Sequence, residues 1–131
     1  MEPTDAQKKY LAMYWNKAML KFGLPQYVTK FKFPQGKKEY FAEIGFGYNE
    51  VTVRFSQKFW NADPSVKRHT IVHEILHIWV NPLVTAVSQL CSGWIPPNIW
   101  TRDQAILTEH EEQLVDALGR VLQEMLPVWK D

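Results

Sequence analysis

The chain has 131 residues, of which 46% are hydrophobic and 22% are charged, with one cysteine and a formal net charge of +1. This length predicts a single domain over residues 1–131, and the hydrophobic fraction excludes wholesale disorder. One cysteine excludes an intramolecular disulfide framework, and the N-terminal segment lacks a signal-peptide pattern, so we expect a cytoplasmic protein. The near-zero charge argues against a nucleic-acid partner. No uninterrupted apolar run approaches about 18 residues, which argues against a membrane partner.

An amphipathic helix is predicted over residues 4–22, because apolar and aromatic side chains recur there at helical spacing. Thr4 suits the N-cap position, and Gly23 followed by Pro25 ends the helix. We expect its aromatic stripe to lie in the core rather than to form a binding platform.

Three strands are predicted next, over residues 26–33, 40–48 and 50–56. The third strand alternates apolar and polar side chains, and Asn49 lies where a tight turn would join it to the second. We therefore expect a small, mostly antiparallel sheet. As an edge of that sheet, the strand over residues 50–56 could pair with an extended substrate.

Asp63 and Pro64 predict the start of a long apolar helix, since aspartate is a favoured N-cap and proline a favoured first helical residue. Asn81 and Pro82 are expected to break or kink this helix, because proline lacks the backbone N–H that a helix interior needs.

Three further segments are predicted beyond that proline. Residues 83–90 form a short helical piece, and a last helix runs to Leu126. Between them, residues 93–100 (GWIPPNIW) are expected to be an aromatic, proline-rich loop that either walls a cleft or caps the core.

The long helix contains His73-Glu74-Ile75-Leu76-His77, an H-E-x-x-H motif. His73 and His77 are four residues apart, so they project from one helical face and can bind one zinc ion. Glu74 can hydrogen-bond a zinc-bound water and act as general base. Apolar residues flank the motif on nearly all sides, and polar groups on so buried a helix need partners. A metal ion would supply that partner; the alternative is a hydrogen-bonded pair of core histidines with Glu74 in an ion pair.

His69 lies one further turn towards the start of the helix. Eight residues of helix rise about 12 Å, whereas a Zn–N bond is only about 2 Å long. One straight helix therefore cannot bring His69, His73 and His77 to the same ion, and we expect His69 at the surface or beside a ligand.

A third protein ligand is expected in the acidic segment over residues 108–119, because catalytic zinc sites usually have three. Glu112, Asp116 and Gly119 lie at i, i+4 and i+7 along one edge of its apolar stripe. Gly119 would let this helix approach the histidine helix closely, and that approach would bring Glu112 to the metal. Asp116 could then accept the free ring N–H of one of the two histidines.

Glu111 is the rival ligand, since it lies near the centre of the same stripe by helical angle. Thr108-x-x-Glu111 also matches a capping box, in which Glu111 would bond back to the Thr108 amide at a helix N-terminus. We favour Glu112 as the third ligand and keep Glu111 as the alternative.

The H-E-x-x-H motif followed by E-x-x-x-D resembles the gluzincin metallopeptidases, over about residues 63–126. Residues 112–119 (EQLVDALG) look like the ligand helix of thermolysin-like enzymes and are similar to the E-x-x-A-[DN]-x-F-[AG] segment of the ImmA/IrrE group. The layout is similar to that of minimal zincins of phages and bacteria. The resemblance implies an α+β, zincin-like fold with an N-terminal helix, a small sheet, an active-site helix and a C-terminal ligand helix. It also implies zinc ligands at His73, His77 and Glu112, a base at Glu74 and an orienting carboxylate at Asp116.

Together these patterns predict a zinc-dependent metallopeptidase that hydrolyses a peptide or protein substrate. A histidine or tyrosine often stabilises the oxyanion in such sites, and His110, His69 and Tyr48 are the candidates. Two other interpretations stay open. One is a catalytically silent zincin-fold binding or regulatory protein that retains structural zinc. The other is a domain without metal, in which the motif is accidental.

Overall fold

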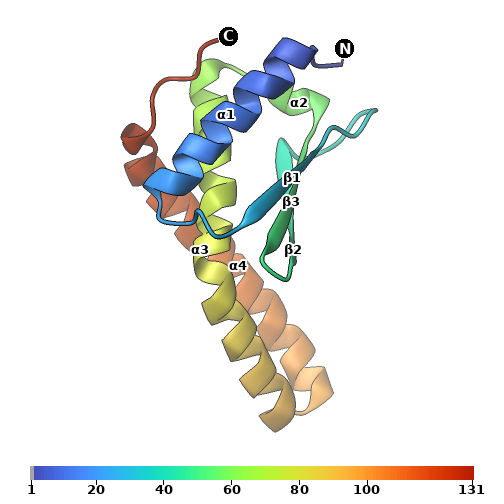
Figure 1. Cartoon of the computed structure of the whole chain (residues 1–131). Coiled ribbons are helices and arrows are strands. Elements are labelled where there is room, and N and C mark those ends of the chain that lie inside the picture. The colour runs from blue at the N-terminus through green and yellow to red at the C-terminus, as the bar shows by residue number, and fades with distance from the viewer. Residues whose placement is uncertain (1) are drawn as a thin grey trace.

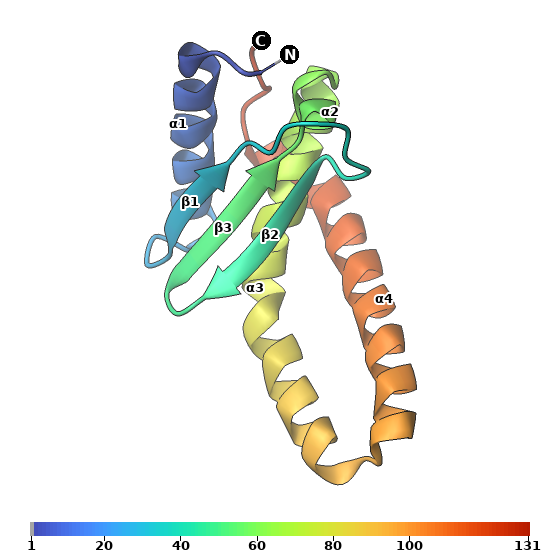
Figure 2. The same ribbon diagram turned by 90° about the vertical axis from the view of Figure 1, so that its right-hand side faces the viewer.

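A computed structural model describes residues 2–131 and shows an α+β fold, in which four helices accompany a three-stranded mixed sheet (Figure 1). In chain order the elements are α1 (Asp5–Lys21), β1 (Val28–Lys32), β2 (Ala42–Gly47), β3 (Glu50–Phe55), α2 (Gln57–Trp60), α3 (Pro64–Trp94), α4 (Pro97–Leu122) and the 3-10 turn η1 (Gln123–Met125). One face of the sheet lies against α1 and the first half of α3, and α4 runs back alongside α3 (Figure 2).

The predicted N-terminal helix is confirmed as α1. Thr4 accepts a hydrogen bond from the Gln7 amide, and the Gln7 side chain bonds back to the Thr4 amide, which completes a capping box. Gly23 has φ of +75°, the left-handed conformation that commonly follows a helix end. Leu11 and Trp15 are fully buried, so the aromatic stripe belongs to the core, as expected.

The three strands are confirmed, but the expected pairing is wrong in two respects. The order is β1-β3-β2, with β3 parallel to β1 and antiparallel to β2, so the sheet is mixed rather than mostly antiparallel. The strand over residues 50–55 is central, not an edge, because it pairs with β1 on one side and with β2 on the other. The segment between β1 and β2 carries the chain past β3, which leaves β2 as an edge strand.

The tight turn between β2 and β3 lies where the sequence placed it. Gly47 pairs with Glu50, which leaves Tyr48 and Asn49 as a two-residue connection. Asn49 has φ of +53°, a backbone conformation that asparagine tolerates better than most residues.

Helix α3 begins at Pro64 after an Asp63 N-cap, as predicted, but it does not break at Pro82. It continues for 31 residues to Trp94. Pro82 removes one backbone hydrogen bond and strains the preceding turn. Helix α4 runs alongside α3 (Figure 2), so the helix continues through the proline as one arm of a helical hairpin.

Residues 93–100 do not form a loop, and both roles expected for them are wrong. Helix α3 includes Trp94 and α4 begins at Pro97, so this segment is the turn of a helical hairpin. The turn lies at the end of the hairpin that extends away from the sheet and the core (Figures 1 and 2). By length and composition α3 is apolar enough to cross a membrane, and 44% of its most apolar window is buried in the fold.

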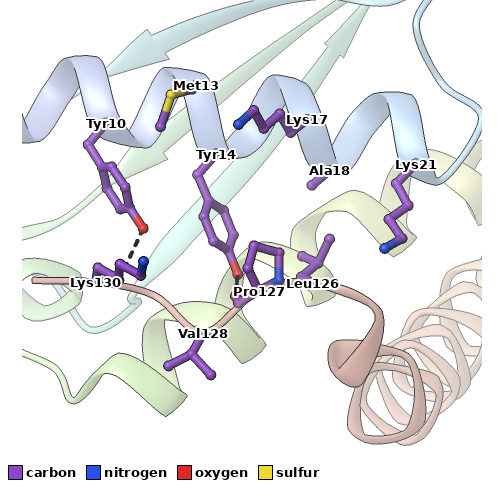
Figure 3. A pocket seen from close by; sticks show the side chains of 10 residues that line it. All are labelled: Tyr10, Met13, Tyr14, Lys17, Ala18, Lys21, Leu126, Pro127, Val128 and Lys130. Atoms are coloured by element: carbon purple, nitrogen blue, oxygen red, sulfur yellow. Dashed lines mark hydrogen bonds between the residues drawn. The ribbon is translucent and has the colours of Figure 1, made fainter.

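The C-terminal segment after η1 packs against α1. The Tyr14 hydroxyl donates to the Pro127 carbonyl, and the Lys130 amide donates to the Tyr10 hydroxyl at 3.1 Å (Figure 3). Burial raises the pKa of Tyr14 to about 12. A cavity of about 360 Å³ lies between the two segments, while Trp129 is buried against the ring of Tyr10.

An ion pair between a buried lysine and a half-exposed aspartate lies at this end of the molecule. Lys67 is only 4% exposed, and its Nζ lies 2.6 Å from Asp131 Oδ1. The hydrogen bond from Lys67 lowers the pKa of Asp131. The stabilisation that this pair gives the folded state is therefore present at neutral pH, and it is lost as pH falls through the lowered pKa of Asp131.

We expect Asp131→Asn to lower the free energy of unfolding by about 1 kcal/mol at pH 7, since Asp131 itself is half-exposed. Asparagine keeps the acceptor for the Trp129 indole N–H, so the change isolates the charge. Urea unfolding measures the difference, which should shrink below pH of about 4. A pH-independent difference would contradict the ionic origin.

Candidate metal centre

The H-E-x-x-H motif lies in the middle of α3, where this helix meets both α4 and β2. Glu74 and His77 are buried, and His73 is partly buried. A cavity of about 320 Å³ opens beside the motif. Its lining comes from three elements: Ala42, Glu43, Ile44 and Phe46 of β2, His73, Glu74 and His77 of α3, and Glu111 and Glu112 of α4.

The structure brings together the three predicted ligands. His73 Nε2 lies 3.2 Å from His77 Nε2. The Glu112 carboxylate reaches both rings, with one oxygen 3.2 Å from His73 Nε2 and the other 3.0 Å from His77 Nε2. One donor atom from each residue lies within 4.8 Å of the other two, a grouping that could hold a metal ion.

Glu111 occupies a different place from the one its sequence suggested. Its carboxylate lies 2.6 Å from His77 Nδ1, on the side of the ring away from His73. The expected capping box is wrong, because α4 begins at Pro97 and Thr108 is therefore inside the helix, where its hydroxyl donates to the Gln104 carbonyl. The position of Glu111 at the centre of the apolar stripe was the sequence signal for an inward role.

The hydrogen-bonding capacity of this cluster fits a bound cation. Glu111 lies against His77 Nδ1, so in the neutral ring with its proton on Nδ1 the Nε2 lone pair would be free to bind a cation. That lone pair faces a carboxylate oxygen of Glu112, which is also an acceptor. Burial lowers the pKa of His73, which favours its neutral form. Two imidazole nitrogens and a carboxylate suit several divalent transition metals, and Zn²⁺ is one of them.

Glu74 lies beside the three ligands without belonging to their group. Its side chain is only 6% exposed. Burial raises its pKa to about 8, and the charges of Glu112 and Glu43 act in the same direction. A carboxyl group in this environment can accept and hold a proton near neutral pH.

Asp116 contacts His69 rather than His73 or His77. One oxygen lies 3.1 Å from His69 Nε2, and the other accepts from Arg120 at 2.9 Å. The hydrogen bond to His69 lowers the pKa of Asp116. Asp116 was expected to orient His73 or His77. In the structure it is hydrogen-bonded to His69 instead.

His69 forms a second grouping that could hold a metal, with His73 and Asp116. Among residues 2–131 no such grouping contains both His69 and His77, in agreement with the argument from helical rise. A Cβ added at Gly119 would lie 3.3 Å from His69 Cε1, so glycine permits the close approach of α4 to α3. The group of His73, His77 and Glu112 is better placed for catalysis, because it borders the cavity and lies beside Glu74.

The other residues considered for the site lie apart from it. Tyr48 is 94% exposed at the β2–β3 turn, and His110 is exposed on α4. Neither lines the cavity, whereas the edge strand β2 does. The strand that borders the site is therefore β2, not the strand over residues 50–56.

Comparison with known proteins gives no relative: no family model, curated protein or solved structure matches the chain.

Proposed function

We propose that this chain is a zinc-dependent metallopeptidase of the gluzincin type, with a minimal zincin-like fold. The observation that carries the proposal is the convergence of His73, His77 and Glu112 beside a buried Glu74, at a cavity open to solvent. The order of an N-terminal helix, a sheet, a motif helix and a ligand helix supports the same assignment.

Each residue has a distinct chemical role in this proposal. His73, His77 and Glu112 would hold zinc, which when bound supplies Lewis acidity for the scissile carbonyl and acidifies water. Glu74 accepts the proton of the attacking water at its carboxylate and later delivers it to the leaving amine. Glu111 keeps His77 in the tautomer that turns Nε2 towards the cavity.

The edge strand β2 suggests how a substrate would lie. Among the described residues β2 pairs only with β3, so its other edge has free backbone N–H and C=O groups beside the cavity. An extended peptide could add to this edge as a further strand, with its side chains near Ile44 and Phe46. This mode favours an unfolded or flexible segment of a protein as substrate.

Metal analysis and a cleavage assay on the same preparation test the proposal. We expect one zinc ion per chain, cleavage within a diverse peptide mixture detected by mass spectrometry, loss of cleavage with a chelator and recovery when zinc is returned. Stoichiometric zinc without cleavage would favour a binding protein with structural zinc. Absence of bound zinc, together with no thermal shift on its addition, would favour an accidental motif.

A further inference from the structure

The far end of the α3–α4 hairpin carries an uncharged surface outside the proposed site. Residues 78–101 contain no Asp, Glu, Lys, Arg or His. We call residues 89–101, which surround the turn, the hairpin tip. Trp94 is 86% exposed and Leu90 is 64% exposed, and Ile99 is also exposed. The hairpin extends past the sheet (Figure 2), so these side chains lie far from the core.

Several backbone groups of the turn are hydrogen-bonded within the turn itself. The Ile95 amide donates to the Cys91 carbonyl at 2.9 Å. Pro96 and Pro97 have no N–H to satisfy. The amides of Ile99 and Trp100 both donate to the Pro96 carbonyl, at 3.0 and 2.9 Å. These internal bonds and the two prolines leave few free donors, which lowers the cost of placing the turn at the boundary of an apolar medium.

The hydroxyl groups at the tip are satisfied internally as well. Ser92 Oγ donates to the Gln89 carbonyl at 3.1 Å, and Thr101 Oγ1 donates to the Pro97 carbonyl at 2.9 Å. Such bonds back to the preceding turn remove the need for water at a hydroxyl group.

We propose that the hairpin tip inserts into the interface of a lipid bilayer. Tryptophan is suited to this depth, because its ring is apolar and its indole N–H can reach the headgroups. Trp94 and Ile95 are consecutive, as are Ile99 and Trp100, so they point in different directions around the turn. Lipid can surround a surface that is apolar on several sides, whereas the face of one partner protein would cover only one of those sides.

The positions of the nearest charges limit the insertion to a shallow depth. Arg102 and Asp103 lie five and six residues beyond Pro97, and the rise to Arg102 is about 7.5 Å. A distance of this size matches the depth of about 5–10 Å to which interfacial helices bury their apolar face in a bilayer. Beyond the buried Ile78, residues 79–94 of α3 rise only about 24 Å, less than a hydrocarbon core of about 30 Å. The chain then returns through α4, so the hairpin enters one leaflet and does not span.

Vesicle flotation of the full chain tests this proposal without any assay of activity. We expect binding to neutral phosphatidylcholine vesicles that persists in high salt, since the tip has no charge. Trp94→Glu should reduce the bound fraction by at least about tenfold, and Leu90→Glu should also reduce it. Tyr48→Glu is the matched control, because Tyr48 is an equally exposed aromatic on another protrusion, and it should bind as the unaltered chain does.

Cys91 provides an independent readout, as the one cysteine of the chain and a half-buried residue of the tip. A bimane label there should be quenched by brominated lipid. Failure to bind neutral vesicles would overturn the proposal, as would binding that salt abolishes and Trp94→Glu leaves unchanged. A concentration-dependent dimer that Trp94→Glu disrupts, without vesicle binding, would make the tip a contact between copies instead.

Discussion

Replacing Glu74 by glutamine is expected to reduce peptide hydrolysis by about 10²–10⁴-fold while zinc remains bound. Glutamine keeps the size of the side chain and its ability to hydrogen-bond, but it cannot take a proton from water. The fold should tolerate the change, because burial raises the pKa of Glu74 to about 8 and so already favours the uncharged form in the metal-free chain. Cleavage rate and zinc content, measured on one preparation, give the comparison.

Glu109→Gln is the matched control for this variant. Glu109 is an exposed carboxylate on the same helix as Glu112, and it does not line the cavity. The Glu109→Gln variant should leave both cleavage and zinc content unchanged. Unaltered cleavage by the Glu74 variant would remove Glu74 from the role of base. Loss of zinc together with cleavage would place Glu74 among the groups that hold the metal.

Local signals in the sequence were enough to predict the elements that depend on local chemistry. The N-cap at Thr4, the N-cap at Asp63 and the turn at Asn49 each act over a few residues, and each lies where it was predicted. The helical spacing of His73 and His77 places their rings together for the same reason.

The pairing of the strands and the continuity of α3 depend on contacts between distant segments. No pattern within residues 26–33 indicates that β1 pairs with β3 in parallel, because register is set by the partner strand. Pro82 has a real tendency to break a helix, yet α3 continues through it as one arm of the hairpin with α4. An uninterrupted apolar run indicates a helix that spans a membrane. A hairpin tip that enters only the interface does not need such a run.

The roles of the two adjacent glutamates depend on where α4 begins. A helix that began at Thr108 would use Glu111 as a capping residue. Since α4 begins at Pro97, both Glu111 and Glu112 are in its interior and turn towards α3. The apolar stripe gave their direction, but only the start of the helix distinguishes a capping carboxylate from one that contacts His77.

Variants of these two glutamates should separate a zinc ligand from the residue that orients a ligand. Glu111→Gln should lower zinc affinity by about 10–100-fold, the usual effect of losing a partner that orients a ligating histidine. Glutamine at position 111 can still accept from His77 Nδ1, so the coordinating set itself is intact.

Glu112→Gln should lower zinc affinity by more than Glu111→Gln does, because it removes the one carboxylate that contacts both His73 and His77. Competition with a chromogenic zinc chelator at pH 7 measures both affinities, with Glu109→Gln again as control. The reverse order of effects would make Glu111 the third ligand and Glu112 its neighbour at the rim of the cavity. Equal, small effects would mean that neither carboxylate completes the site and that the proposed peptidase centre is not formed by these helices.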